Sequence, residues 1–506
     1  MDSVFDQGPP APCPAPFNMA AHVLSCAKNQ PDKIALSVLG RDGAENWSYA
    51  QIEAAVRGIA TGFLTLGLMP GDIVLLRLGN TPEFPLAYLG AITAGLLPVP
   101  SSSQLTEAEV ARIIADLNPA LILHQPGVPC PGHPARLDAS ALEPMHRLSP
   151  ADFAMGDPDR PGYIVYTSGT SGQPRAVLHA HRAIWARQMM MRGWYGLTAE
   201  DRLLHAGAFN WTYTLGTGVM DPWTMGATAL ITAPGTAPAD IPALLRQHEA
   251  TIFAAAPGVY RQILKQHDTL DLPALRHALS AGEKLSPTLK TAWEDATGKP
   301  VYEAYGMSEI STFISASPDH PARDNALGQP QQGRRIAILG DHGPVPRGEQ
   351  GVIAVHRGDP GLMLEYLGAP EDTAARFQGD WFLTGDQGIM AADDQVHYLG
   401  RADDMMNAGG YRVSPIEVEQ ALTTHPGITA VGCAEVEVKQ DARVIAAFYT
   451  GPAPIPEADL AAFAATRLAR YKQPRMYIYL PELPTGPNGK LLRRSLKSLV
   501  PDATHG

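Results

Sequence analysis

A short segment rich in glycine and hydroxyl side chains constrains the fold more than any other part of the chain. The segment reads Tyr-Thr-Ser-Gly-Thr-Ser-Gly-Gln-Pro-Arg at residues 166–175 and follows an apolar run at 162–166. Glycine lets backbone N–H groups approach an anion, and hydroxyl groups with a closing cation, Arg175, complete a nest for phosphate oxygens. The apolar run predicts a strand, so the loop falls where open α/β sheets bind ligands, at a strand's carboxyl end. The pattern therefore indicates a nucleotide as the ligand. The segment is not a Walker loop, because the Gly-Lys-Ser/Thr ending is absent. An ordinary surface loop rich in serine and glycine is the alternative.

Hydrophobic patterning along the first 400 residues also predicts an α/β fold. The apolar runs at 72–76 and 120–124 predict buried strands. The segment 105–118 between them predicts a helix, because Thr106 and Glu109 form a capping box ahead of apolar residues at helical spacing. Such alternation is typical of βαβ units, and 506 residues exceed what one core usually serves. We expect a large N-terminal domain of stacked sheet–helix layers at 17–402, preceded by a flexible or surface-draped arm at 1–16.

The pattern changes after residue 400. Two acids, Asp403 and Asp404, precede a Gly-rich turn at 407–410 and a helix start, Ser-Pro-Ile-Glu, at 414–417. The remaining strand-like and helix-like segments lie at 431–438, 444–449, 457–468 and 476–480. A smaller α+β domain over residues 403–506 is therefore expected.

Charge and composition exclude several classes of partner. The formal net charge is −12 and no Lys/Arg-rich block is present, which argues against nucleic acid. The longest apolar run, at 86–99, is too short to span a bilayer, and residues 1–16 lack a signal-peptide pattern. The four cysteines are scattered without metal-ligand spacing, as is usual for reduced thiols. We expect a soluble cytoplasmic protein without a membrane or nucleic-acid partner.

Four further motifs follow the glycine-rich segment in a fixed order. They are Tyr-Glu-Ala-Tyr-Gly-Met-Ser-Glu at 302–309, Leu-Thr-Gly-Asp at 383–386, Gly-Arg-Ala-Asp-Asp at 400–404 and Pro-Thr-Gly-Pro-Asn-Gly-Lys at 484–490. Together the five motifs resemble the AMP-forming acyl-CoA synthetases of the adenylate-forming superfamily, which also contains luciferases and peptide-synthetase adenylation domains. The chain looks most like the acetate, medium-chain and aromatic-acid branches, and the resemblance extends from about residue 17 to about residue 499.

The resemblance implies a ligase that works in two steps. A carboxylic acid and ATP first give acyl-AMP and pyrophosphate, and CoA then takes the acyl group and releases AMP. The first step brings two anions together, so it needs cations, amide donors and a divalent metal at the phosphates. By resemblance, Ser308 binds the α-phosphate, Glu309 ligates Mg²⁺, and Lys490 bridges the substrate carboxylate and the α-phosphate.

Further residues are placed around the nucleotide by the same resemblance. Asp386 accepts from the ribose hydroxyls and Arg401 reaches the same region. The rest of this set is Thr167, Ser168, Gly169, Thr170, Ser171, Gly172, Arg175, Gly282, Glu283, Glu303, Ala304, Tyr305, Gly306, Met307 and Tyr398. Taken singly, the acids are also compatible with solvated surface positions, Arg401 with a surface ion pair, and the Pro-Asn-Gly-Lys run with a plain turn.

The second step needs a different face of the small domain. In the family, this domain rotates about the aspartate that corresponds to Asp403, and a Gly-rich turn then lines the pantetheine tunnel. The residues expected to contact CoA are Gly409, Gly410, Tyr411, Arg412, Arg470 and Lys472. Two alternatives stay open: an enzyme that loads a separate carrier protein, and a catalytically retired nucleotide-binding module.

The acid is expected to lie between the glycine-rich segment and the Glu309 motif. Candidate pocket residues are Trp211, Tyr213, Thr214, Ala256 and Met307. No acidic residue stands at 209–216, where amino-acid-activating relatives place an aspartate, so an uncharged side chain on the substrate is favoured. We expect the substrate to be a short, medium-chain or aromatic acid. The alternative for Trp211 and Tyr213 is a place in the hydrophobic core, which is as common for such aromatic residues as a place in the pocket lining. The sequence also allows a homodimer.

Overall fold

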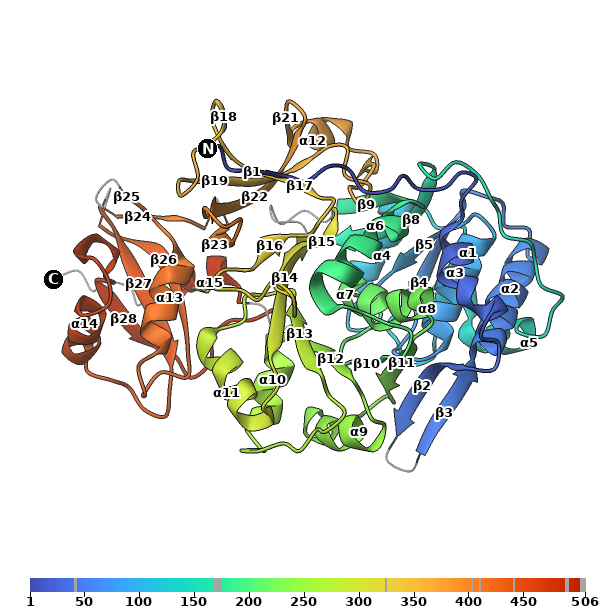
Figure 1. The fold of residues 1–506 in the computed structure, drawn as a ribbon, viewed down its shortest axis with the longest axis horizontal. Coiled ribbons are helices and arrows are strands. Elements are labelled where there is room, and N and C mark those ends of the chain that lie inside the picture. The colour runs from blue at the N-terminus through green and yellow to red at the C-terminus, as the bar shows by residue number, and fades with distance from the viewer. Residues whose placement is uncertain are drawn as a thin grey trace.

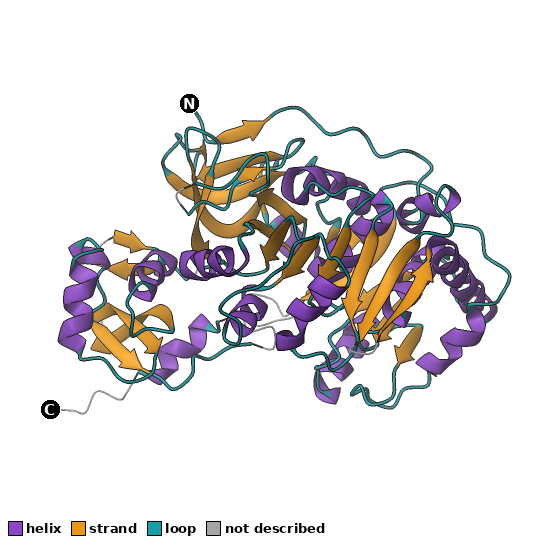
Figure 2. Ribbon diagram, turned by 60° about the horizontal axis from the view of Figure 1, so that its bottom comes forward, coloured by secondary structure: helices purple, strands orange, loops and turns teal. Residues whose placement is uncertain are grey.

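The computed structural model describes residues 1–40, 43–167, 175–323, 325–401, 404–408, 411–439, 442–486 and 491–500. These residues form a large α/β body and a smaller C-terminal domain that lies at one end of it (Figure 1). In Figure 2 helices flank the strands of the large body, and the small domain repeats the mixture on a smaller scale. The two-domain α/β architecture predicted from the sequence is confirmed.

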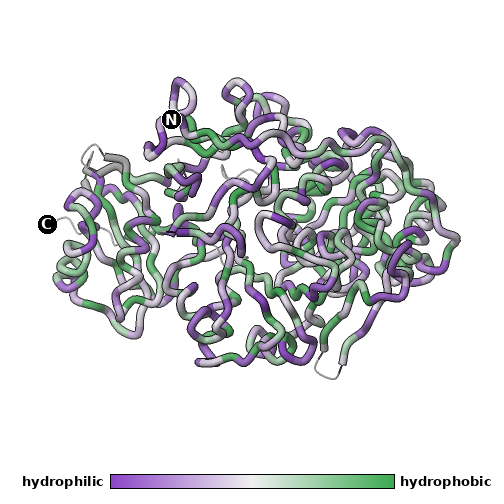
Figure 3. The backbone as a smooth tube through the Cα atoms, in the orientation of Figure 1, coloured by the Kyte–Doolittle hydropathy of each residue, from purple (hydrophilic) through white to green (hydrophobic). Residues whose placement is uncertain are grey.

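A nine-stranded sheet forms the centre of the large body. Its strand order is β16-β15-β14-β13-β12-β10-β11-β2-β3, and the strands from β14 to β2 run parallel. Their bounds are β2 (Ile34–Gly40), β3 (Gly43–Ser48), β10 (Arg202–His205), β11 (Thr228–Thr232), β12 (Ile252–Ala255), β13 (His277–Ala281), β14 (Val301–Met307), β15 (Ser311–Ser315) and β16 (Gln329–Pro330). Most residues of the parallel strands are buried because helices cover the sheet, and apolar segments run through this part of the molecule in Figure 3.

A second, parallel sheet of four strands packs beside the first. Its members are β4 (Ile73–Arg77), β5 (Leu97–Pro100), β6 (Leu121–His124) and β7 (Arg136–Asp138). The predicted helix between β5 and β6 is α4 (Glu107–Leu117), and its capping box is present, with Glu109 N to Thr106 Oγ1 at 3.3 Å and Thr106 N to Glu109 Oε2 at 2.8 Å. The predicted strands and helix of this region are thus confirmed.

The remaining helices of the large body lie around these sheets. Their bounds are α1 (Met19–Val23), α2 (Tyr49–Thr65), α3 (Glu83–Thr93), α5 (Leu142–Met145), α6 (Ala183–Met190), α7 (Thr212–Leu215), α8 (Asp221–Met225), α9 (Ile241–Gln247), α10 (Pro257–Leu264), α11 (Pro287–Thr297) and α12 (Pro370–Ala374). The π-helical turns η3 (Met191–Tyr195) and η4 (Gly216–Met220) continue α6 and α7. No helix in the described ranges has both the length and the apolar character that crossing a bilayer requires.

The glycine-rich segment joins two antiparallel strands. The strands are β8 (Pro161–Thr167) and β9 (Arg175–Ala180), and β20 (Glu365–Tyr366) adds a third strand beside β9. The predicted strand before the loop is confirmed. Residues 168–174, which include the predicted phosphate ligands Ser168, Gly169, Thr170, Ser171 and Gly172, lie outside the described residues.

A third sheet includes a short strand from the N-terminal arm. Its strands are β1 (Val4–Asp6), β17 (Arg335–Gly340), β18 (Gly343–Pro344), β19 (Gln350–His356), β21 (Phe377–Gln378), β22 (Trp381–Met390) and β23 (Val396–Arg401). Strand β1 pairs with β17 in the register Val4 to Ala337, and Phe5 is buried in the core. The arm at 1–16 is therefore not flexible throughout, because residues 4–6 complete a sheet edge.

The small domain begins beyond β23. Its elements are β24 (Met406–Ala408), β25 (Tyr411–Val413), α13 (Pro415–Thr423), β26 (Ala430–Lys439), β27 (Ala442–Thr450), α14 (Glu457–Ala465), β28 (Met476–Tyr479) and α15 (Arg493–Leu496). Ser414 caps α13, accepting from Glu417 N at 3.3 Å, and its hydroxyl also donates to Leu399 O of β23. The predicted hinge, Asp403, lies outside the described residues.

Candidate active site

The motif at 302–309 forms β14 and the tight turn into β15. The β14–β15 ladder shifts register between Tyr305 and Gly306. A Cβ added to Gly306 would lie 2.1 Å from Ser311 O, so only glycine fits there. The turn projects Ser308 and Glu309 from the carboxyl end of β14, the end at which parallel sheets bind ligands.

Hydrogen bonds tie this turn to the strands that flank the glycine-rich segment. On β9, the His179 ring donates from Nε2 to Ser308 O at 2.8 Å. The Tyr366 hydroxyl of β20 donates to Glu309 Oε1 at 2.7 Å, and Met363 N donates to Glu309 O at 2.7 Å. The predicted α-phosphate and metal ligands therefore lie beside the ends of the predicted phosphate loop.

The cation that closes the loop also lies at Tyr366. The Arg175 guanidinium carbon is 5.1 Å from the Tyr366 ring centroid, and Arg175 forms an ion pair with Asp372. Thr167, at the other end of the loop, donates to Arg175 O at 3.4 Å. Glu309 and Arg175, the predicted metal ligand and the predicted phosphate cation, thus share Tyr366 as a neighbour.

Burial keeps His179 neutral in the folded protein. The ring stacks on Tyr163 with centroids 4.7 Å apart, and burial lowers the pKa of His179 to about 4 from 6.5. Since the unfolded chain binds this proton below pH 6.5 and the folded chain only near pH 4, stability falls as pH decreases through that window.

Replacing His179 with glutamine should reduce this acid sensitivity. Glutamine keeps an N–H donor for Ser308 O but cannot be protonated. Because each pH unit between the two pKa values corresponds to about 1.4 kcal/mol, the loss of unfolding free energy from pH 7 to pH 5 should be about 2 kcal/mol smaller in the variant. Urea unfolding at both pH values measures this, and equal losses in the two proteins would show that His179 does not titrate as described.

A second group of polar side chains lies where β14 meets strands β22 and β23 of the third sheet. Tyr305 donates its hydroxyl to Asp386 Oδ2 at 2.5 Å, and Arg401 Nη1 lies 3.3 Å from Asp386 Oδ1. Asp386 and Arg401 are register partners on β22 and β23, and the Tyr398 ring centroid is 5.5 Å from that of Tyr305. Burial, then the charge of Asp386, raises the pKa of Tyr305 well above its usual value, so the phenol stays a donor. The structure brings these four predicted nucleotide residues together.

The predicted adenine-side wall is built around Gly282 and Glu303. Gly282 has a φ of +96°, and a Cβ there would lie 2.3 Å from Trp211 Cζ2, so only glycine lets the indole approach the backbone this closely. Glu303 pairs with Lys284 Nζ at 2.6 Å and accepts from Leu285 N at 2.9 Å. The contacts of Glu303 therefore hold the segment that follows β13. Of the other predicted residues, Ala304 is buried in β14 and Glu283 directly follows Gly282.

Of the predicted acyl-pocket residues, two are core residues in this structure. Tyr213 packs against Trp194, His205 and Trp211, with ring centroids 5.7, 4.3 and 5.2 Å away. Thr214 is fully buried. Trp211, Ala256 and Met307 are only partly buried.

The predicted small-domain residues are described only in part. Lys490, Gly409 and Gly410 lie outside the described residues, and Tyr411 and Arg412 are placed only as members of β25. Arg470 is exposed, whereas Lys472 Nζ forms an ion pair with Glu417 Oε1 at 2.5 Å.

The segment that follows Lys490 is firmly attached. Arg493 Nη2 contacts Glu419 of α13 through both carboxylate oxygens, at 2.6 and 2.8 Å. An isolated bridge pairs Thr485 with Leu491. The described residues that precede and follow Lys490 in the sequence are therefore attached to the small domain.

The site fits one divalent metal that is completed by phosphate. In the described part of the chain no three His, Cys, Asp or Glu side chains cluster as a metal site. Tyr366 occupies one oxygen of Glu309, and Oε2 hydrogen-bonds no described group. A single carboxylate with phosphate oxygens is the usual arrangement for Mg²⁺.

Several residues of the site were not predicted from the sequence. They are His179, Lys284, Tyr366 and the buried pair Arg187 and Asp221. For His179 a signal existed: alternate strand residues share a face, so it lies on the same face of β9 as Arg175. Tyr366 carries no comparable signal, because β20 has only two residues.

Comparison with known proteins agrees with this geometry. The family model "AMP-binding enzyme" matches residues 24–367, and the model "AMP-binding enzyme C-terminal domain" matches residues 417–490. The chain is 27% identical to acyl-coenzyme A synthetase ACSM3, mitochondrial, of Homo sapiens (96% of this chain, 90% of the relative). It is 28% identical to 3-hydroxybenzoate–CoA ligase of Aromatoleum sp. (strain CIB), with 90% and 92% covered.

Solved structures give the same result. The crystal structure of the anthranilate CoA ligase AuaEII in complex with anthranoyl-AMP superposes with a TM-score of 0.86 at 25% identity, covering 96% of this chain and 98% of that one. A benzoate CoA ligase from Burkholderia xenovorans LB400 gives a TM-score of 0.83 at 26% identity, with 95% and 100% covered. With the family model matching more than half of the sequence, the chain belongs to the AMP-binding enzyme family.

Proposed function

We propose that this protein is an AMP-forming acid–CoA ligase, which couples a carboxylic acid to CoA through an acyl-AMP intermediate. The observation that carries the proposal is the convergence of three features on one edge of the large body. These are the Ser308–Glu309 turn, the ends of the glycine-rich segment, and the group of Tyr305, Asp386 and Arg401. Together they match the metal, phosphate and ribose of one nucleotide.

In the first step, a carboxylate oxygen of the acid attacks the α-phosphorus of ATP and pyrophosphate leaves. Bound Mg²⁺ supplies positive charge to the phosphate oxygens. Ser308 would donate to the α-phosphate, Glu309 would hold the metal, and Arg175 would neutralise the outer phosphates. Lys490 would lie between the two reacting anions, where its charge stabilises the transition state more than the separated reactants.

In the second step, the thiol of CoA attacks the acyl carbonyl and AMP leaves with the bridging oxygen. The proposal assigns this step to a rotation of the small domain about Asp403, which brings residues 409–412 to the site. The described contacts at this junction join the end of β23 to the start of α13. Ser414 bonds to Leu399, and an added Cβ on Gly400 would lie 3.6 Å from Ile416. Such an interface is compatible with rotation.

The proposed acid is apolar, and an aromatic acid is favoured. The partly buried Trp211 lies against Gly282, and the partly buried Met307 lies at the end of β14, so apolar side chains are available on the acid side of the proposed site. Relatives named as ligases of 3-hydroxybenzoate, benzoate and anthranilate support the same choice. Scattered free cysteines support a cytoplasmic location.

A substrate panel tests this proposal. Acids from acetate to decanoate and a series of benzoates are supplied with ATP, Mg²⁺ and CoA, and AMP release and acyl-CoA formation are measured by mass spectrometry. We expect AMP and acyl-CoA in equal amounts with at least one apolar acid, and neither product with free amino acids. Faster transfer to a phosphopantetheinylated carrier than to CoA would favour the carrier-loading alternative. Nucleotide binding without acid-dependent pyrophosphate exchange for any acid would identify a retired module.

A further inference from the structure

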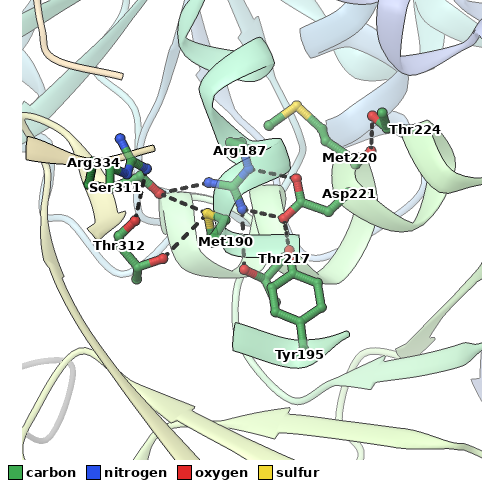
Figure 4. Close-up of polar contacts among 10 residues, drawn as sticks. All are labelled: Arg187, Met190, Tyr195, Thr217, Met220, Asp221, Thr224, Ser311, Thr312 and Arg334. Atoms are coloured by element: carbon green, nitrogen blue, oxygen red, sulfur yellow. Dashed lines mark hydrogen bonds and ion pairs between the residues drawn. The ribbon is translucent and has the colours of Figure 1, made fainter. Parts of the chain in front are cut away.

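A buried ion pair lies beside Ser311, two residues beyond Glu309 (Figure 4). Arg187 of α6 contacts Asp221 of α8 through two bonds, Nε to Oδ1 at 2.6 Å and Nη2 to Oδ2 at 2.5 Å. The two side chains are 8% and 0% exposed. Tyr195 also donates its hydroxyl to Asp221, and Thr217 Oγ1 accepts from Arg187 Nη2 at 3.2 Å. Asp221 and Thr217 thus both hold the guanidinium, and Tyr195 in turn holds Asp221.

The free end of this guanidinium reaches the turn that carries Glu309. Arg187 Nη1 donates to Ser311 Oγ at 2.7 Å, and Ser311 is two residues beyond Glu309. Ser311 has a φ of +69°, a left-handed conformation that non-glycine residues adopt only where the surroundings impose it. The carbonyl of Ser311 is the group that a side chain at position 306 would meet. A shift of Ser311 would therefore move both ends of the turn.

The turn is held by both apolar and polar contacts. Ile310 of the turn is buried in the core. The turn also borders a small cavity whose lining includes Tyr163, His179, Arg187, Ser308 and Ser311. Along this cavity the turn is held by the polar contacts of His179 with Ser308 and of Arg187 with Ser311.

We propose that Arg187 is a positioning residue for adenylation. Locked by Asp221, it holds Ser311 in the left-handed conformation and thereby sets the place of Ser308 and Glu309 at the nucleotide. The same pair connects this turn to the segment from Thr212 to Met225, which follows the proposed acid-side residue Trp211. The inference rests on the proposed function, because it concerns the geometry of that site.

Replacing Ser311 with glycine is the most direct test. Glycine adopts a φ of +69° without strain, which offsets part of the stability lost with the Arg187 hydrogen bond, so the variant should still fold. It lacks the hydroxyl that Arg187 contacts. We expect kcat for acid-dependent ATP–pyrophosphate exchange to fall about 100-fold, the scale for a catalytic group displaced by about 1 Å. Affinity for Mg²⁺ with a non-hydrolysable ATP analogue, measured by calorimetry, should fall about tenfold.

Arg187 itself is tested with lysine. An ammonium keeps a positive charge beside Asp221 but lacks the planar fork that reaches Asp221 and Ser311 at once. The Arg187→Lys variant should lose exchange activity to a similar degree, and adding it to Ser311→Gly should cause little further loss, since both remove one contact. Arg276→Met is the matched control. It breaks the pair with the buried Asp201, at the opposite end of β13, and should lower stability without lowering exchange per folded enzyme.

The outcomes separate this inference from the proposed function. Wild-type exchange and wild-type Mg²⁺–nucleotide affinity in Ser311→Gly would overturn the positioning role. So would additive losses in the double variant. Absence of exchange in the unmodified protein with every acid would instead contradict the proposed function, and the calorimetric comparison would still decide whether Arg187 positions the turn.

Discussion

Replacing Lys490 with alanine is expected to lower adenylation at least about 100-fold while leaving the thioester step largely intact. A loss of this size is usual when one preorganised charge or hydrogen-bond donor is removed from a site where negative charge develops in the transition state. The split between the two steps follows from domain rotation, because Lys490 would face the nucleotide only while the acyl-AMP forms. ATP–pyrophosphate exchange measures the first step, and conversion of supplied acyl-AMP and CoA measures the second.

A nearby cation provides the control for this experiment. Lys497 is exposed and lies on the same C-terminal segment, so Lys497→Ala changes net charge equally without touching the site. It should leave both steps unchanged. If Lys490→Ala slows both steps equally, the residue acts in the fold of the small domain rather than at the α-phosphate.

Replacing Glu309 with glutamine should have the other large effect. Glutamine retains an oxygen for the Tyr366 hydroxyl but removes the negative charge that would hold the metal. We expect adenylation to fall about 100- to 1,000-fold, and the Mg²⁺ concentration needed for half-maximal rate to rise. Initial rates at varied Mg²⁺ and fixed ATP measure both quantities.

Tyr366→Phe is the matched variant for Glu309. It removes the hydrogen bond to Oε1 but leaves the carboxylate, so we expect a loss of about 10- to 100-fold, the scale of one hydrogen bond to a charged group, without a rise in the Mg²⁺ requirement as large as that of Glu309→Gln. A Glu309→Gln enzyme with an unchanged Mg²⁺ requirement would contradict the assignment of Glu309 as the metal ligand.

Local sequence patterns predicted single helices and strands better than they predicted which strands pair with each other. The α4 capping box, the strand before the glycine-rich segment and the Ser414 cap were all read from neighbouring residues and are present. Strand β1 was not predicted, because three residues are too few to show alternation and its stability depends on β17, more than 300 residues away. Sequence spacing carries no information about such a pairing.

The same limit applies to the site. The order of motifs led to Tyr305, Asp386 and Arg401, and the structure places these side chains in contact. The residues that hold the Ser308–Glu309 turn in place could not be predicted from the sequence. Arg187 and Asp221 lie on different helices, 34 residues apart, and each would ordinarily be read as a surface charge. Their burial depends on how helices pack around β14 and β15, which is a property of the whole fold.

Isotope transfer from the acid to AMP tests the acyl-adenylate mechanism most directly. The enzyme is supplied with an accepted acid carrying ¹⁸O at both carboxylate positions, together with ATP, Mg²⁺ and CoA, and the nucleotide product is analysed by mass spectrometry. Attack of the carboxylate on the α-phosphorus, followed by departure of AMP from the acyl carbon, places one ¹⁸O in each AMP and none in pyrophosphate. Unlabelled AMP, or ADP and phosphate as the products, would contradict the mechanism.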